Sequence, residues 1–258
     1  KAYVNMGLAK GYAAGAGAGP LARCGWPTDE RYFPTVLQLP ADADFTAPPE
    51  GFAPLTCRQL GLYPVVDSLE WLALLLPLGL NIIQLRIKQP GADLAEQIRQ
   101  AVNMAASYQT RLFINDHWQL AIECGAYGVH LGQEDLQAAD LGAIYRAGLR
   151  LGISTHGYAE LCRARQFRPS YIALGHIFAT QTKKMPSKPQ GLARLRRYQT
   201  LAGDIPTVAI GGISQARFAD VVDTGVNGVA VVSAITRAAE PVAAVIRLKE
   251  TYDRVKQR

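Results

Sequence analysis

The stretch 82-IIQLRIK-88 contains the pattern that decides the fold. Successive side chains of a β-strand point to opposite faces, so a strand here would place its apolar and polar side chains on different sides. The apolar side would consist of Ile83, Leu85 and Ile87, and the polar side of Gln84, Arg86 and Lys88. In a half-solvated sheet the polar side would simply face water. The neighbouring strands therefore determine whether that interpretation holds.

Seven further runs of this kind follow or precede the first, and segments with helical spacing separate them. The eight runs are 61-GLYPVVD-67, 82-IIQLRIK-88, 111-RLFIND-116, 127-YGVHLG-132, 149-LRLGIST-155, 171-YIALGHIF-178, 206-PTVAIGGI-213 and 228-GVAVVSAI-235. Strand and helix alternating eight times predict an α/β fold of the (β/α)₈ TIM barrel type. A doubly wound open sheet would more often have a Gly-rich turn after its first strand, and none follows Asp67.

A barrel gives the polar side of 82–88 a different environment, because outer helices would cover the apolar side and the polar side would point inward. Burying two cations without partners is costly. We therefore expect Arg86 and Lys88 near the open C-terminal mouth, with anions opposite them. That mouth is where barrels of this type place their active sites.

The first part of the chain differs from the rest in composition. The piece 11-GYAAGAGAGPLARCGWP-27 is rich in Gly and Ala, and 39-LPADADFTAPPEGFAP-54 is rich in Pro, Ala and Asp, which is typical of linkers. We predict an irregular N-terminal extension over residues 1–58 and a barrel domain over residues 59–258. The chain begins with Lys1 rather than Met, which suggests a piece of something longer.

The composition narrows the class of protein. With 258 residues, 49% of them hydrophobic, the chain can bury one large core. The longest apolar run, 71–83, is too short for a membrane helix, and the N-terminus has no secretory signal pattern. Four widely separated cysteines favour reduced thiols in a cytoplasmic protein. A net charge of +6 without a long basic run predicts a small anionic ligand rather than nucleic acid.

Acidic residues follow two neighbouring strands. The third strand ends in 114-IND-116 and the loop after the fourth reads 132-GQED-135, which places Asn115, Asp116, Glu134 and Asp135 at the mouth. Carboxylates on adjacent loops suit Mg²⁺, which one or two carboxylates, substrate phosphates and water usually hold. Two alternatives remain: Asp135 could cap the following helix, and Asp116 could merely pair with Arg86.

A second set of residues at the mouth is suited to phosphate. The loop 179-ATQTKKMPSKPQG-191 is long and cationic, and Thr180, Thr182 and Lys183 could hold a phosphate, although a solvated basic loop is the alternative. Gly211 and Gly212 end the seventh strand, where backbone N–H groups often bind phosphate in such barrels. Two phosphate-binding areas at one mouth predict a transfer between two phosphorylated small molecules. The four histidines lack metal-ligand spacing, so we interpret them as local hydrogen-bonding residues.

These strand-end motifs resemble those of the thiamine phosphate synthase family. The motifs are QLRIK, IND, GVHLGQEDL, LGIST, ALGHIFATQTK, AIGGI and VVSAI, and they cover nearly all of residues 61–240 in order. The resemblance implies an enzyme that joins the diphosphate of 4-amino-5-hydroxymethyl-2-methylpyrimidine to the phosphate of 4-methyl-5-hydroxyethylthiazole. Diphosphate would leave through a dissociative transition state.

The resemblance also implies roles for individual residues. The pyrimidine diphosphate would be held by Gln84, Leu85, Arg86, Ile87, Lys88, Asn115, Ser154 and Lys183, of which Arg86, Lys88 and Lys183 would assist catalysis. Mg²⁺ would be held by Asp116 and Asp135. The thiazole phosphate would be held by Thr180, Gln181, Thr182, Gly212, Val232 and Ser233.

The piece 1-KAYVNMGLAKGYAAGAGAGPLA-22 is similar to the last helix and tail of hydroxymethylpyrimidine phosphate kinases, which implies a covalently linked upstream kinase domain. The piece is too short to carry kinase activity itself. Two other functions stay open. A thiazole tautomerase-like enzyme would not need the QLRIK cations together with both aspartates, and a non-catalytic regulatory barrel would bind phosphorylated metabolites without turnover.

Overall fold

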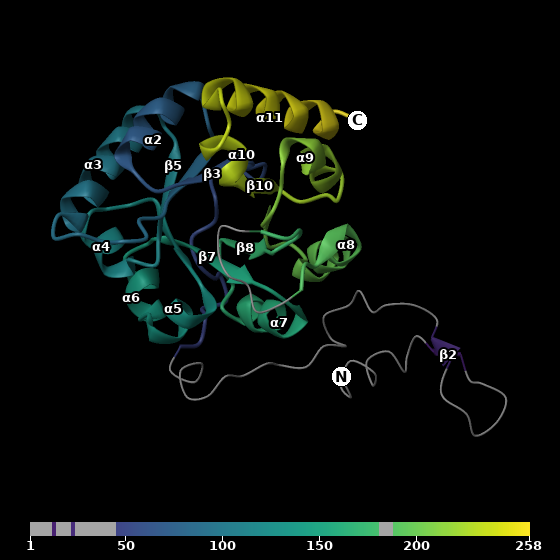
Figure 1. Ribbon diagram of the computed structural model, residues 1–258. Helices are drawn as coiled ribbons and strands as arrows, with labels where there is room; N and C mark the ends of the chain where they lie inside the picture. Colours follow the sequence, from purple (N-terminus) through teal and green to yellow (C-terminus); the bar gives the residue numbers. More distant parts are fainter. Residues whose placement is uncertain (1–11, 14–21, 24–44, 181–187) are drawn as a thin grey trace.

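The computed structural model of this chain describes residues 12–13, 22–23, 45–180 and 188–258. Its main strands are β3 (Gly61–Val66), β4 (Ile82–Leu85), β5 (Arg111–Asn115), β6 (Gly128–Leu131), β7 (Arg150–Thr155), β8 (Tyr171–Leu174), β9 (Thr207–Ile210) and β10 (Gly228–Val231). All eight are parallel to their neighbours and close into a barrel in the order β10-β3-β4-β5-β6-β7-β8-β9 (Figure 1). The predicted (β/α)₈ barrel is confirmed. A separate two-stranded sheet pairs β1 (Tyr12–Ala13) with β2 (Ala22–Arg23).

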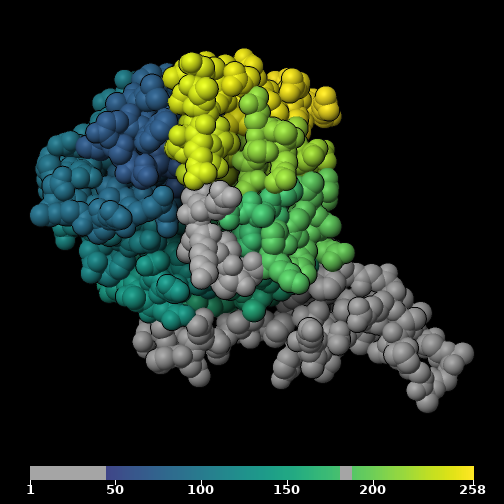
Figure 2. Space-filling model, in the orientation of Figure 1, coloured from purple at the N-terminus to yellow at the C-terminus, as the bar shows by residue number. Residues whose placement is uncertain are grey.

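Helices surround the strands on the outside (Figure 1). They are α2 (Leu69–Leu75) with the 3₁₀ turn η4 (Leu76–Leu78), α3 (Leu94–Ser107), α4 (Trp118–Glu123), α5 (Gln133–Ala138), α6 (Leu141–Arg146), α7 (Tyr158–Gln166), α8 (Gly191–Ala202), α9 (Gln215–Val222), α10 (Ser233–Thr236) and α11 (Pro241–Lys256). The final helix, α11, contacts both β3 and α2. In Figure 2 this yellow C-terminal part lies against the blue beginning of the barrel, so the first and last units complete the ring.

The quoted stretch 82–88 behaves as predicted over its first half. Ile83 and Leu85 are buried in the outer core under the helices, while Gln84 is only 4% exposed and points into the barrel. The strand ends at Leu85, however, three residues earlier than the pattern predicts. Charged side chains gain hydration at the mouth, so Arg86 and Lys88 lie in the loop after the strand, with Lys88 exposed.

Aromatic rings fill the barrel interior below the mouth. The rings of Phe113 and Tyr171 meet edge to face at 5.1 Å, and Tyr63 lies 5.9 Å from Tyr171. Glycines on neighbouring strands leave room for these rings. A Cβ atom at Gly152 would lie 2.3 Å from Cζ of Tyr171, and one at Gly128 would lie 2.5 Å from Cε1 of Phe113. The interior is therefore a packed layer that supports the site above it.

Residues 45–58 cross the opposite end of the barrel, where the strands begin. Phe52 is 3% exposed and its ring meets Tyr145 at 5.8 Å. Ser170 donates to the carbonyl of Ala53 at 2.7 Å, and Nε of Arg111 donates to Thr56 at 2.6 Å. We call residues 45–58 the strap. The domain boundary between residues 58 and 59 stays a prediction, and the strap contacts determine how stable a fragment starting there can be.

Candidate active site

Two carboxyl groups meet where β5 and β6 end. Asp116 directly follows β5, with its backbone in the left-handed region at φ 64°. Its amide donates to the carbonyl of His130 at 2.9 Å, and the Asn115 side chain donates to its carboxylate. The pKa of Asp116 is raised to about 6, first by burial and then by the charge of Asp135 and a hydrogen bond with it, whereas Arg86 opposes this shift. The structure therefore brings the predicted pair, Asp116 and Asp135, together.

This contact bears on the two alternatives left open by the sequence. Asp135 lies in the first turn of α5, but its side chain interacts with Asp116, which disfavours a role limited to capping. Arg86 attracts Asp116 electrostatically, so that pairing exists beside the carboxylate pair rather than in place of it. Asp116 also occupies a backbone conformation that is uncommon for non-glycine residues, and such residues cluster at functional sites.

The carboxylate pair fits a hard divalent cation. Within the described ranges, no group of three or more His, Cys, Asp or Glu side chains could hold a metal ion. Mg²⁺ does not need such a cage, because it is usually held by one or two carboxylates while water and substrate phosphates complete its coordination. Burial and then the like charge of Asp135 raise the pKa of Asp116, and a cation bound by both carboxylates would relieve their mutual repulsion.

The two cations of QLRIK lie at the same mouth in different surroundings. Arg86 is partly buried and faces the charge of Asp116. Nζ of Lys88 lies 4.0 Å from a carboxylate oxygen of Asp67, with both side chains about half exposed. Such a surface pair contributes about 1 kcal/mol or less to stability, so it holds Lys88 only loosely. Both cations are therefore placed to meet an anionic ligand.

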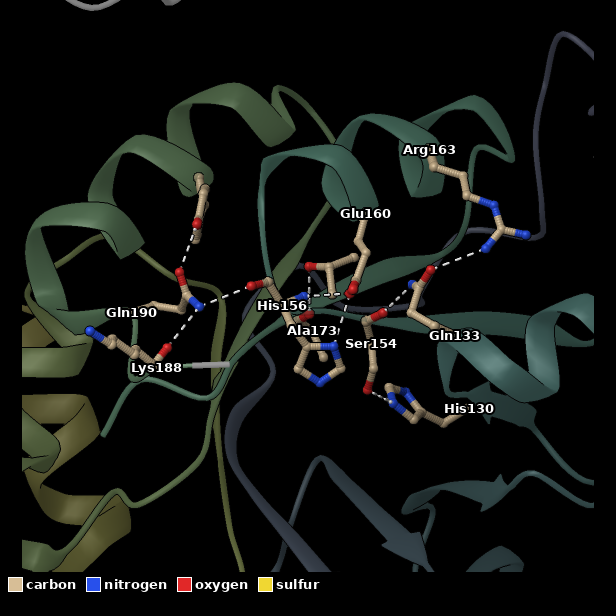
Figure 3. A network of polar contacts seen from close by, with 11 residues as sticks. His130, Gln133, Ser154, His156, Glu160, Arg163, Ala173, Lys188 and Gln190 are labelled. Carbon is tan, nitrogen blue, oxygen red and sulfur yellow. Dashed lines mark hydrogen bonds and ion pairs between the residues drawn. The ribbon is translucent and has the colours of Figure 1, made fainter. Parts of the chain in front are cut away.

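A buried chain of hydrogen bonds joins two of the predicted ligand-binding residues. Nε2 of Gln84 donates to the Tyr63 hydroxyl at 3.3 Å, and that hydroxyl lies 2.9 Å from the hydroxyl of Tyr171. The Tyr171 hydroxyl lies 2.7 Å from Nδ1 of His130, whose Nε2 lies 2.8 Å from the hydroxyl of Ser154. Figure 3 shows the last of these contacts. The chain fixes Gln84 and Ser154 relative to each other across the mouth.

The middle of this chain was missed by reasoning from sequence. Burial raises the pKa of both Tyr63 and Tyr171, so their hydroxyls stay protonated and able to donate. His130 was interpreted only as a local hydrogen-bonding residue, yet it connects β8 to β7. The alternation of side chains along a strand could have indicated these residues, because side chains two positions apart point to the same face. Tyr63 stands two residues before Val65, which points inward, and His130 stands two residues after Gly128, which also faces the interior.

Glycines shape the opposite edge of the mouth. Gly211 and Gly212 both have positive φ, 101° and 65°. A Cβ atom at Gly212 would lie 2.3 Å from the carbonyl oxygen of Ala179, so only glycine allows this approach of β9 to the loop after β8. Val232 and Ser233 directly follow β10, the strand that pairs with β9, and Ser233 begins α10. Thr180 ends a described segment, and the predicted residues Gln181, Thr182 and Lys183 lie outside the described residues.

The barrel and its mouth define a class of protein. Carboxylates, cations and glycines at the carboxyl ends of barrel strands are the arrangement of a (β/α)₈-barrel enzyme that acts on phosphorylated ligands. Residues 55–235 match the family described as thiamine monophosphate synthase, and the chain belongs to that family. It is an enzyme of thiamine phosphate biosynthesis.

Individual relatives agree with this assignment. The chain is 59% identical over 201 residues to thiamine-phosphate synthase of Serratia proteamaculans (strain 568), covering 78% of this chain and 95% of that protein. It is 62% identical over 188 residues to thiamine-phosphate synthase of Yersinia pestis (strain Pestoides F), covering 72% and 87%. Neither the tautomerase nor the regulatory barrel finds support among them.

Solved structures give the same picture at the level of the fold. Thiamine phosphate pyrophosphorylase from Pyrococcus furiosus superposes with a TM-score of 0.68 at 28% identity, covering 77% of this chain and 98% of that one. A 3-hexulose-6-phosphate synthase from Salmonella typhimurium superposes with a TM-score of 0.58 at 17% identity, which shows the shared barrel alone. Within the described ranges, no helix is long and apolar enough to cross a membrane.

Proposed function

We propose that this chain couples 4-amino-2-methyl-5-(diphosphooxymethyl)pyrimidine with 4-methyl-5-(2-phosphooxyethyl)thiazole, giving thiamine phosphate and diphosphate. The observation that carries the proposal is the two-sided mouth, with the Asp116–Asp135 pair and Arg86 on one side and the Gly211–Gly212 edge on the other. Identity of 59% to a thiamine-phosphate synthase supports the same reaction.

In the proposed reaction the bond between the pyrimidine methylene carbon and the diphosphate oxygen breaks, and its electron pair leaves with the diphosphate. The aminopyrimidine ring stabilises the methylene cation, and the thiazole nitrogen supplies the electron pair of the new C–N bond. Arg86, Lys88 and Lys183 oppose the negative charge that grows on the leaving group, so they act most strongly in the transition state. No protein nucleophile is required.

Asp116 and Asp135 would hold Mg²⁺, which when bound supplies positive charge beside the leaving diphosphate. Gln84, Asn115 and Ser154 would bind and orient the pyrimidine diphosphate, whereas Leu85 and Ile87 pack toward the outer core and would act by holding this segment in place. The buried tyrosine and histidine chain supports this role, because it fixes the side chains of Gln84 and Ser154 in place. Preorganised donors of this kind need no rearrangement during the reaction.

The thiazole phosphate would bind at the other edge, to Thr180, Gln181, Thr182, Gly212, Val232 and Ser233. Glycine at position 212 supports this assignment, since its lack of a side chain lets the end of β9 approach the loop after β8, which leads to Thr180. A covalently linked kinase domain upstream and a cytoplasmic location are further parts of the proposal. The free thiols of Cys57, Cys124 and Cys162 are in keeping with a reducing compartment.

The decisive experiment is turnover by the purified chain with both substrates and Mg²⁺, followed by measuring thiamine phosphate and diphosphate. We expect both products in equal amounts. Conversion of the thiazole phosphate alone would instead indicate a tautomerase. Binding of both compounds without turnover would indicate a regulatory barrel.

A further inference from the structure

Gln133 links three elements around the mouth. It is the first residue of α5, two positions before Asp135. Its Nε2 donates to the carbonyl oxygen of Ser154 in β7 at 2.6 Å. Its Oε1 accepts from Nη1 of Arg163 in α7 at 3.1 Å (Figure 3). One amide therefore connects the element that carries a predicted metal ligand to the strand that carries a predicted substrate ligand.

Arg163 determines how that amide is oriented. Its side chain is 2% exposed, and its guanidinium carbon lies 5.6 Å from the centre of the Phe167 ring. A guanidinium can only donate, so the amide oxygen of Gln133 must face it. The amide nitrogen must then face the carbonyl of Ser154, which can only accept. Burying an arginine costs free energy unless its donors are hydrogen-bonded, and the amide oxygen of Gln133 accepts from one of them.

Ser154 is held from two sides. Its carbonyl accepts from Gln133, and its hydroxyl is bonded to Nε2 of His130 at 2.8 Å. A shift of Gln133 would move the end of β7 and release the Ser154 hydroxyl from its place over the mouth. The same shift would move the first turn of α5, which carries Asp135.

We propose that Gln133, oriented by Arg163, is a positioning residue that holds the Asp135 carboxylate and the Ser154 hydroxyl in one geometry. The inference rests on the proposed site, in which Asp135 binds Mg²⁺ and Ser154 binds the pyrimidine diphosphate. Replacing a residue that holds a metal ligand in place typically lowers metal affinity 10- to 100-fold.

A similar amide bridge holds the chain two residues further on, just after the end of β7. Nε2 of Gln190 donates to the carbonyl of His156 at 2.9 Å, and its Oε1 accepts from Nη1 of Arg194 at 3.1 Å. The hydroxyl of Tyr198 donates to the same oxygen at 2.8 Å. The end of β7 is thus held by Gln133 of α5, and the residue after the strand is held by Gln190, which directly precedes α8 (Figure 3). Of the two bridges, the one through Gln133 is the one that reaches Ser154.

The test variant is Gln133→Glu. It keeps the side-chain length and an acceptor for Arg163, but it replaces the donor to Ser154 with a repelling oxygen. We expect kcat to fall about 10- to 100-fold, as for a small misplacement of a reacting group, with the KM for thiazole phosphate unchanged. Gln137→Glu makes the same change on an exposed position of the same helix and serves as the control. We expect it to leave kcat unchanged.

A second measurement follows Mg²⁺ without turnover. Mg²⁺ should raise the melting temperature of the wild-type chain, and Gln133→Glu should need about tenfold more Mg²⁺ for half of that effect. A merely structural role would lower the melting temperature without moving the Mg²⁺ midpoint. An unchanged Mg²⁺ midpoint together with an unchanged kcat in Gln133→Glu would overturn the inference.

Ser154→Ala separates this inference from the site on which it rests. If Ser154→Ala is slow and Gln133→Glu matches the wild type, the proposed site stands and the positioning role is wrong. If Ser154→Ala turns over normally, the site assignment itself is wrong, and the inference fails with it. We expect the double variant to be about as slow as the slower single one. Fully multiplicative losses would contradict action through Ser154.

Discussion

The carboxylates of Asp116 and Asp135 lie close together, and without a bound cation their repulsion lowers the stability of the folded state. Burial first, and then the charge of Asp135, raise the pKa of Asp116 to about 6 from an ordinary value of 3.8. Because the folded state binds the proton more tightly than the unfolded state, this group favours folding at low pH. That contribution is lost as pH rises through about 6.

We therefore predict that Asp116→Asn stabilises the metal-free chain at pH 7 by about 1 kcal/mol, a value reduced from the full shift because the side chain is partly exposed. Activity should fall strongly in the same variant. Urea unfolding in the presence of a chelator, at pH 7 and pH 5, measures the effect, and the gain should shrink at pH 5. A less stable variant at pH 7 would contradict the repulsion argument.

Arg86 and Lys88 lie on the carboxylate side of the mouth, so they should serve the diphosphate rather than the thiazole phosphate. Replacing either with Ala should weaken transition-state stabilisation by roughly 2 to 4 kcal/mol in kcat/KM. Calorimetry with thiazole phosphate alone should show little change. Ser233→Ala is the comparison, and we expect it to weaken thiazole phosphate binding instead. An equal loss of affinity for thiazole phosphate in the Lys88 and Ser233 variants would contradict the assignment of two separate sites.

At the scale of elements, the end of β9 and the loop after β8 approach each other through Gly212. Gly212→Ala combines a left-handed backbone, φ 65°, with a Cβ atom 2.3 Å from the carbonyl oxygen of Ala179. Gly148 has a similar φ of 71° with nothing within 4 Å of its would-be Cβ. Gly148→Ala therefore measures the backbone cost alone, about 1 kcal/mol.

We predict that Gly212→Ala is clearly more destabilising than Gly148→Ala and that it alone raises the KM for thiazole phosphate. Denaturant unfolding and steady-state kinetics on the two variants give the answer. Equal destabilisation with an unchanged KM would mean that the approach of β9 to the loop does not shape the phosphate edge.

At the scale of the whole molecule, the strap ties the beginnings of several strands together. Phe52 is buried against Tyr145, and the strap is bonded to residues just before or at the start of β5 and β8. A chain that begins at residue 59 keeps all eight strands but loses these contacts. Burying one large aromatic side chain alone contributes about 3 kcal/mol.

We predict that a chain beginning at residue 59 folds and keeps synthase activity at 25 °C but melts at a lower temperature than a chain beginning at residue 45. Phe52→Ala in the full chain should reproduce much of that loss. Differential scanning calorimetry of the three proteins provides the measurement. Equal melting temperatures for the two truncated chains would show that the strap contributes little.

The sequence by itself determined the order of eight strands, the mouth to which Asp116, Asp135 and Gly212 belong, and the two faces of residues 83–85. Those features follow from local rules, since side chains alternate along a strand and parallel strands end at one edge. The tertiary structure alone decided that Tyr63 meets Tyr171 and that Arg163 orients Gln133. Such contacts join elements far apart in the chain. They therefore depend on closure of the barrel and on close packing, in which glycines leave room for aromatic rings.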